Sequence, residues 1–242
     1  GVWADDVIAL DAGQGRRSIR PAKGIHIVVP WHKVRNDIAV VIPVPKDKRS
    51  LFVVPWGDPH DGGFRHTYIG TTDTDYDGPL DDPRVTAEDI AYVLRALNAS
   101  VNTGITEADV TGTWAGLRPL VVGDDDHAVK GRTADLSRRH KVIVSPSGVI
   151  SVFGGKLTTY RRMAEDTVDA IGAHLADRHR CHTKRLRLVG ADGYCEPAEK
   201  SPDIHLAHRF GSQADELVAL IAQRPELAEP LVIGLPYLKA EG

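Results

Sequence analysis

Alternation of apolar and polar positions predicts a β-sheet in the first third of the chain. Four β-branched runs bounded by Pro, Gly and Asp predict strands over residues 24–30, 37–44, 50–56 and 65–76. Because the turns between these runs are short, we expect antiparallel pairing and no helical crossovers. Residues 110–120 return to a strand pattern, and residues 141–155 predict a hairpin around Ser-Pro-Ser-Gly.

A helical spacing of apolar residues predicts a helix over residues 87–102. Its apolar face carries Ile90, Leu94, Leu97 and Val101. Thr86 precedes it with Asp89 three residues on, a pairing that typically caps a helix N-terminus. A second helix is expected from Thr158, directly after the hairpin. Its buried side is predicted to consist of Met163, Val168, Ile171 and Leu175.

The last quarter of the chain has a different pattern. Residues 177–203 show no sustained period and predict a linker. Residues 212–223 then predict a capped amphipathic helix that begins a helical appendage. The chain starts without Met or a leader and stops in a helix-like run, so we expect it to be a segment of a longer protein.

Composition limits the possible functions. The 242 residues are 42% hydrophobic and 26% charged, an ordinary globular balance with room for one large domain or two modest ones. A net charge of −3 argues against a general nucleic-acid-binding protein. Cys181 and Cys195 are interpreted as reduced thiols of a cytoplasmic protein. The irregular spacing of His179, Cys181 and His182 disfavours a metal site, and none is predicted.

Residues 9–18 nearly match the dinucleotide-binding pattern G-x-G-x-x-G and follow a strand-like Asp-Val-Ile-Ala-Leu. The sixth position of the pattern is Ser18, however, and Pro21 follows where a helix must continue. We therefore interpret this stretch as a surface turn. No apolar run approaches the ~18 residues that span a bilayer, although peripheral membrane attachment stays open.

Residues 151–175 run from a strand through Gly154 and Gly155 to Lys156 and a helix. Such a turn accommodates an anionic or dipolar group at the helix N-terminus. A tight turn capped by Thr158 or Thr159 explains the same residues without any ligand. The motif alone leaves both interpretations open.

One histidine and three arginines are the other candidates for chemistry. Arg118 ends the strand-like Trp-Ala-Gly-Leu-Arg-Pro-Leu, and Arg138 and Arg139 precede the hairpin. Guanidinium groups suit phosphate and carboxylate partners, although most arginines are solvated surface charges. His26 lies inside a strand pattern, where a lone histidine is more often structural than catalytic.

Four stretches occur in one order: KGIHIVVP, IGTTDTDYDG, TWAGLRPL and SVFGGKLTTYRRMAE. With them the chain resembles the FAD-dependent glycerol-3-phosphate dehydrogenases, relatives of the D-amino-acid oxidases, from Val2 to about Leu238. The resemblance implies an α+β fold with FAD as cofactor and with the family's own G-x-G-x-x-G upstream. The implied domains are an FAD-binding part (1–19 and 141–175), an antiparallel substrate cap (20–140), a linker (176–202) and the start of a helical C-terminal domain (203–242).

The resemblance also assigns roles to individual residues. The flavin-contacting turn maps to Gly154, Gly155, Lys156, Leu157 and Thr158. His26 is the implied catalytic base and Arg118 the group that polarises the forming carbonyl, with Arg138 and Lys156 binding substrate. Two departures are notable: Ile25 replaces a usual small hydroxyl residue, and the Ser-Arg-Arg-His stretch leaves Arg138 and Arg139 as alternatives.

The implied activity is oxidation of sn-glycerol 3-phosphate to dihydroxyacetone phosphate, with hydride transfer to flavin N5 and electrons passed to a quinone. An oxidase that passes electrons to oxygen would share every motif. A non-catalytic binding or scaffold module is the alternative of a different class, and we expect this segment alone to be inactive. The full-length protein is expected in the cytoplasm, peripherally attached to the cytosolic face of a membrane and without nucleic-acid partners.

Overall fold

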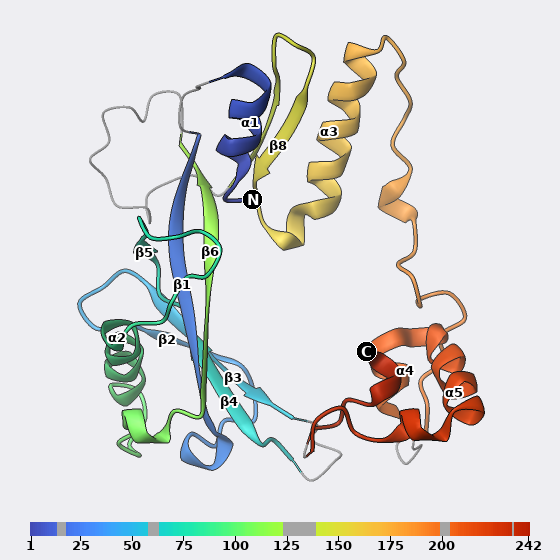
Figure 1. Ribbon diagram of the computed structural model, residues 1–242. Helices are drawn as coiled ribbons and strands as arrows, with labels where there is room; N and C mark the ends of the chain where they lie inside the picture. Colours follow the sequence, from blue (N-terminus) through green and yellow to red (C-terminus); the bar gives the residue numbers. More distant parts are fainter. Residues whose placement is uncertain (14–17, 58–62, 123–138, 199–203, 234) are drawn as a thin grey trace. The chain divides into compact units, whose positions relative to one another are not determined.

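The computed structural model describes residues 1–13, 18–57, 63–122, 139–198, 204–233 and 235–242. The chain divides into two compact units, Gly1–Arg180 and Cys181–Gly242 (Figure 1). This division falls within residues 177–203, where the sequence shows no sustained period.

An antiparallel sheet forms the framework of the first unit. Its strands are β1 (Ile19–Pro30), β2 (Val40–Pro43), β3 (Ser50–Trp56), β4 (His66–Gly70), β5 (Thr74–Asp75) and β6 (Gly112–Val121). The strand order is β2-β3-β4-β1-β5, and β6 pairs with β1 as well. Every pairing is antiparallel, which confirms the prediction from the short turns.

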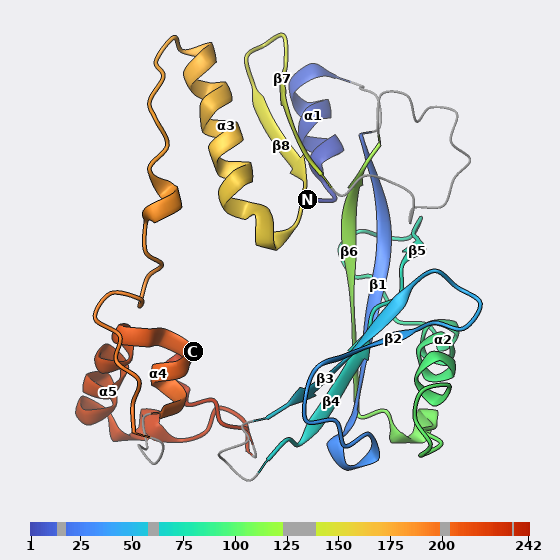
Figure 2. The same ribbon diagram turned by 180° about the vertical axis from the view of Figure 1, so that it is seen from behind.

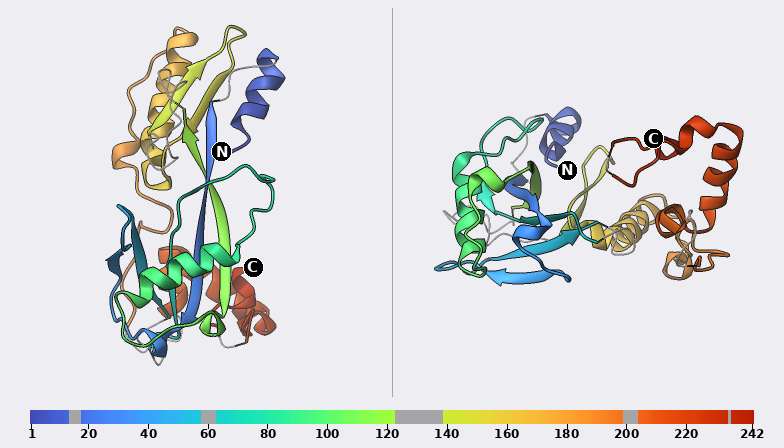
Figure 3. Two further views of the ribbon diagram at one scale, coloured as in Figure 1. Left: turned by 90° about the vertical axis from the view of Figure 1, so that its left-hand side faces the viewer. Right: turned by 90° about the horizontal axis from the view of Figure 1, so that it is seen from below.

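The main core lies between this sheet and the helix α2 (Ala87–Asn98), which lies across one face of the sheet (Figure 3). From β1 the core receives Ile25, Ile27 and Val29, each 0% exposed. The helix contributes Val93, Ala96 and Leu97, with Ile90, Leu94 and Val101 packed at the margin. The predicted cap is confirmed, because Thr86 and Asp89 form a reciprocal capping box.

Asp89 has a second role in the interior. Its Oδ2 accepts the Thr86 N–H at 3.0 Å and also lies 2.6 Å from Nζ of Lys23 on β1. The side chains of this ion pair are 7% and 8% exposed. A charge buried to this extent is tolerated because its partner is present and hydrogen-bonded. One carboxylate therefore closes the start of α2 and neutralises a lysine of the central strand.

A separate hairpin leads to the next helix (Figure 2). Its strands β7 (His140–Val144) and β8 (Ile150–Gly154) are antiparallel, and η5 (Leu157–Thr159) and α3 (Tyr160–His174) follow them. Phe153 of β8 packs with Ile19 and Val121 at the ends of β1 and β6. Ala4 and Ile8 of α1 (Ala4–Ala12) join this small cluster, so the hairpin and α1 are fixed against the sheet.

Two predictions about helices are wrong. The strand-like Asp-Val-Ile-Ala-Leu is part of α1, where alanine and leucine favour helix and two aspartates occupy the first turn. This supports rejecting a dinucleotide loop, which requires a preceding strand; residues 14–17 of that stretch lie outside the described part. Three of the four residues on the predicted buried side of α3 are also exposed, namely Val168 at 62%, Ile171 at 39% and Leu175 at 67%, whereas Met163 is half-buried. Helical spacing identifies residues that share a side, but it does not show that anything covers them.

The second unit contains the helix that the pattern predicts over residues 212–223, but the predicted cap is wrong, because Gln213 precedes the helix without a side-chain capping hydrogen bond. The unit contains α4 (Ile204–Phe210) and α5 (Ala214–Gln223), with Leu206 and Ala214 buried. Short 3-10 turns in the two units are η1 (Trp31–Lys33), η2 (Glu107–Asp109), η6 (Thr183–Arg185), η7 (Gly211–Gln213), η8 (Pro225–Ala228) and η9 (Lys239–Glu241). In the part of the chain that the structure describes, no helix is both long and apolar enough to cross a bilayer.

Candidate functional site

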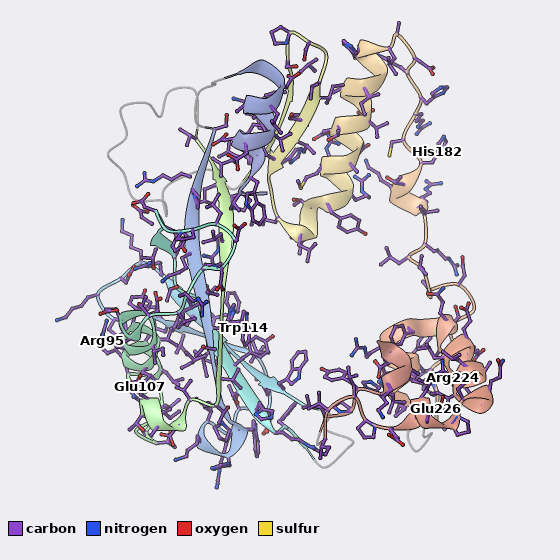
Figure 4. The ribbon with its side chains drawn as sticks, viewed as in Figure 1. Arg95, Glu107, Trp114, His182, Arg224 and Glu226 are labelled. Atoms are coloured by element: carbon purple, nitrogen blue, oxygen red, sulfur yellow. The ribbon has the colours of Figure 1, made fainter. Side chains whose placement is uncertain are left out.

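The face of the sheet opposite α2, called the open face here, carries three exposed aromatic side chains, Phe52, Trp56 and Trp114, which are 46–53% exposed. Because side chains alternate along a strand, His26 points away from the face that Ile25 and Ile27 bury. Its cross-strand partners are Gly70 on β4 and Trp114 on β6, which place their side-chain positions on the same face. Trp114 projects from β6 on the side away from α2 (Figure 4).

The His26 imidazole is held between aromatic rings. It stacks on Trp114 with centroids 4.7 Å apart and an interplanar angle of 14°, and it meets Tyr68 edge-on at 6.0 Å. Partial burial lowers the pKa of His26 below its ordinary value, and the positive charge of Arg118 lowers it further. The ring is therefore neutral near pH 7 and able to accept a proton.

Arg118 lies on the same face as His26. Its register partner on β1 is Ala22, which is four residues before His26, and side chains an even number of residues apart on a strand point to the same face. Its Nη2 donates to Thr71 Oγ1 at 2.7 Å and its Nη1 donates to the Thr72 carbonyl at 3.1 Å. Asp73 Oδ1 lies 3.5 Å from Nη1. These contacts fix the direction of the guanidinium while 28% of the side chain stays exposed.

Two strand glycines make room for these groups, and sequence reasoning missed both. A Cβ on Gly24 would lie 2.4 Å from Arg118 Nη2, and a Cβ on Gly70 would lie 2.4 Å from His26 Cδ2. A glycine inside a strand often marks a place where another group approaches closely. That signal was available in Lys-Gly-Ile-His, but the approaching residue is identified only by the cross-strand register.

The turn from Gly154 to Thr158 shows what its glycines do. Both glycines have φ of +74°, and a Cβ would lie 2.4 Å from Val121 Cγ2 at Gly154 and 2.5 Å from Met163 Sδ at Gly155. Glycine is thus required by the packing of the turn itself. Thr159 occupies the N-cap position of α3, but it makes no side-chain capping hydrogen bond to that helix, so the predicted threonine cap is wrong. Its hydroxyl instead accepts the Lys156 N–H at 3.1 Å and closes the short turn η5.

The outer side of this turn fits an anionic or electron-rich group. The Leu157 side chain is 89% exposed, and Lys156 and Thr158 are exposed beside it. The first N–H groups of a helix have no intrahelical partner, and the helix dipole adds positive potential there. Lys156 adds a full positive charge. The turn therefore suits the edge of a flavin ring, although the contact itself stays a prediction.

The remaining predicted residues are placed as follows. Arg138 lies outside the described residues, so the choice between Arg138 and Arg139 stays open; Arg139 is exposed just before β7. Ile25 is fully buried in the core below the sheet, so this departure from the family's pattern lies on the covered face. Within the described ranges, no group of three or more His, Cys, Asp or Glu residues is arranged to hold a metal ion.

Comparison with known proteins identifies relatives along the whole chain. The sequence is 38% identical over 257 aligned positions to glycerol-3-phosphate dehydrogenase 2 of Mycobacterium tuberculosis (strain ATCC 25618 / H37Rv), covering 100% of this chain and 41% of that protein. It is 32% identical to the aerobic glycerol-3-phosphate dehydrogenase of Staphylococcus aureus (strain USA300), covering 96% of this chain and 44% of that protein. The chain therefore spans less than half the length of these curated relatives.

The fold has a solved counterpart. The crystal structure of the glycerol-3-phosphate dehydrogenase from Bacillus halodurans complexed with FAD superposes with a TM-score of 0.73 and 31% identity, covering 91% of this chain and 44% of that one. The comparisons confirm the resemblance stated from the motifs and the α+β class. The family described as FAD dependent oxidoreductase matches residues 1–161, and the chain belongs to that family.

Proposed function

We propose that the full-length protein oxidises sn-glycerol 3-phosphate to dihydroxyacetone phosphate with FAD as its cofactor. The observation that carries the proposal is the pairing of a neutral imidazole, His26, with a fixed guanidinium, Arg118, on one open sheet face. Membership of an FAD-dependent family and relatives named glycerol-3-phosphate dehydrogenase support the choice of substrate.

The two residues divide the chemistry of alcohol oxidation. A nitrogen of His26 accepts the proton of the C2 hydroxyl, a role for which its lowered pKa keeps it unprotonated. Arg118 donates hydrogen bonds to the C2 oxygen, where negative charge develops before the carbonyl forms. When bound, FAD supplies the acceptor for the hydride that leaves C2. The proton and the hydride together account for the two hydrogens that the product lacks.

The other assigned residues bind and orient the flavin and the substrate. We assign Gly154, Gly155, Lys156, Leu157 and Thr158 to the flavin, with Lys156 and the first N–H groups of the helix stabilising negative charge on the bound ring. Arg138 and Lys156 are assigned to the substrate phosphate, because cationic groups make charge-assisted hydrogen bonds to it. A quinone acceptor, a cytoplasmic location and peripheral membrane attachment complete the proposal and rest on the family resemblance.

An anaerobic reduction assay tests the function. The full-length protein, loaded with FAD, is mixed with glycerol 3-phosphate without oxygen, and the visible flavin absorbance is followed. We expect bleaching by glycerol 3-phosphate, none by glycerol, and recovery of the absorbance when a soluble quinone is added. Flavin that stays oxidised with glycerol 3-phosphate would refute the activity. Faster recovery with oxygen than with quinone, with peroxide formed, would refute the acceptor. The segment 1–242 alone is expected to be inactive.

Replacement of Gly24 by alanine is predicted to separate activity from stability. The new Cβ would lie 2.4 Å and 2.5 Å from the two Arg118 Nη atoms and 2.5 Å from Thr71 Oγ1. These are side-chain atoms, so we expect the guanidinium to be displaced while the fold tolerates the change. Misplacement of a reacting group by about 1 Å lowers turnover by about 10²-fold. The matched control is Gly116→Ala, the register partner of Gly24, where a Cβ meets nothing within 4 Å. Equal steady-state rates for the two alanine variants would contradict this prediction.

A further inference from the structure

The connection Thr71–Asp73 between β4 and β5 provides the hydrogen-bond partners that fix the Arg118 guanidinium. On the open-face side, Arg118 donates to Thr71 Oγ1 and to the Thr72 carbonyl, and Asp73 provides a carboxylate at 3.5 Å. The Thr72 hydroxyl accepts the N–H of Ile25 at 3.1 Å, which ties the connection to β1. The direction of the guanidinium therefore depends on where this short connection lies.

On the side of α2, Arg49 holds the same connection. Its Nη1 donates to the Asp73 carbonyl at 2.6 Å. Its Nε and Nη2 lie 2.9 Å and 2.5 Å from Asp47 Oδ2. Tyr92 of α2 donates to the same Asp47 oxygen at 3.1 Å, and its ring centroid lies 5.0 Å from the Arg49 guanidinium carbon. The planar guanidinium of Arg49 thus joins the connection Thr71–Asp73 to the Asp47 carboxylate and to the Tyr92 ring.

We propose that Arg49 is a positioning residue for Arg118: it fixes the connection Thr71–Asp73 from the side of α2, so that the Arg118 guanidinium stays aimed at the oxygen of the substrate. This inference rests on the proposed oxidation of glycerol 3-phosphate. Arg49 touches neither substrate nor cofactor in this arrangement, because the sheet connection separates it from the open face.

The geometry explains why arginine is needed at this position. The fork bonds a carboxylate with Nε and Nη2 while Nη1 remains directed at the Asp73 carbonyl. A lysine ammonium is a compact point charge, so it cannot bond the Asp47 carboxylate and the Asp73 carbonyl at the same time with the geometry of the guanidinium. The Arg49 hydrogen bonds also hold the pKa of the Asp47 carboxyl well below its ordinary value, so the pair stays ionised. Arg49 therefore acts on Arg118 by fixing its position, and not through a change in the protonation of the Arg49–Asp47 pair.

The first test compares Arg49→Met, Arg49→Lys and Arg95→Met in full-length protein loaded with FAD. Arg49 lines a hollow of about 430 Å³ together with Arg95 of α2. Arg95, which Figure 4 labels, therefore serves as the matched control. With rates normalised to flavin content, we expect kcat to fall about tenfold or more in Arg49→Met, to fall less in Arg49→Lys and to stay unchanged in Arg95→Met. KM should change less than kcat, because Arg118 acts on charge that develops during the reaction. If Arg49→Met fails to load flavin, Arg49→Lys carries the test.

A double-mutant cycle separates positioning from general support of the fold. In an Arg118→Met background the target of positioning is already lost, so adding Arg49→Met should lower kcat no further. A decrease as large as in the wild-type background would overturn the inference and leave the proposed function intact. An unchanged kcat in Arg49→Met would overturn it as well. A wild-type protein whose flavin is not reduced by glycerol 3-phosphate would refute the proposed function, and this inference with it.

Discussion

An Arg118→Met variant of the full-length protein is expected to retain its flavin and to lose about 10²- to 10³-fold in kcat. In the proposed mechanism the guanidinium donates to the oxygen on which charge develops, and methionine has no donor for that oxygen. Without the guanidinium, the buried Thr72 carbonyl still accepts the Thr71 hydroxyl at 2.8 Å, and Thr71 itself is partly exposed, so the connection should keep its place. Stopped-flow measurement of anaerobic flavin reduction gives the rate of this step directly.

The comparison for this variant is Arg84→Met, which removes an arginine whose side chain is 84% exposed. We expect Arg84→Met to reduce its flavin as fast as the wild type. A kcat for Arg118→Met within a few-fold of the wild-type value, at equal flavin content, would remove Arg118 from the mechanism. Arg118→Lys should lie between the two, because lysine keeps the charge and loses the fork.

A His26→Gln variant is expected to lose about 10²- to 10⁴-fold in kcat/KM, the usual contribution of a positioned base. Glutamine keeps a polar side chain of similar length but does not take up a proton at neutral pH. His32→Gln is the matched control, because His32 is an exposed histidine just beyond the same strand. If His26→Gln and His32→Gln lowered kcat/KM equally, the loss would not be specific to His26, and the predicted role of His26 as the base would be contradicted.

The pH dependence gives a second test of His26. Protonated imidazole is no base, so kcat/KM of the wild type should fall as pH drops through the pKa of His26. Burial and Arg118 place that pKa below the ordinary value of 6.5, so activity should persist to lower pH than for an exposed histidine. Arg118→Met removes a positive charge and should raise this pKa, moving the acidic limb to higher pH. An acidic limb unmoved by that substitution would contradict the predicted interaction.

Local patterns predicted most of the described fold. The strands and the helix over Ala87–Asn98 were accessible because alternation, helical spacing and the Thr86–Asp89 cap are all contained within about ten residues. The open face itself was less accessible. The pairing of β1 with both β4 and β6 joins residues far apart in the chain, and no short-range pattern encodes it.

The same distinction between local patterns and contacts between distant strands applies to the residues of the candidate site. His26, Arg118 and the glycine-lysine turn were identified by resemblance to a known family. Gly24 and Gly70 were missed because each acts on a residue of another strand. The exposed side of α3 was mispredicted for a related reason: its spacing is amphipathic, but the sequence does not state which surface covers it.

The shared carboxylate of Asp89 has a consequence for the dynamics of the site. Unravelling the first turn of α2 would remove the anionic partner of the buried Lys23 ammonium and leave it the hydrogen bond to the Arg84 carbonyl, and breaking a buried ion pair in this way costs about 3–5 kcal/mol. The first turn of α2 and the middle of β1 should therefore exchange their amide hydrogens with solvent as one cooperative unit. A helix on the far side of the sheet should thus protect the strand that carries His26, the proposed proton acceptor, from local opening.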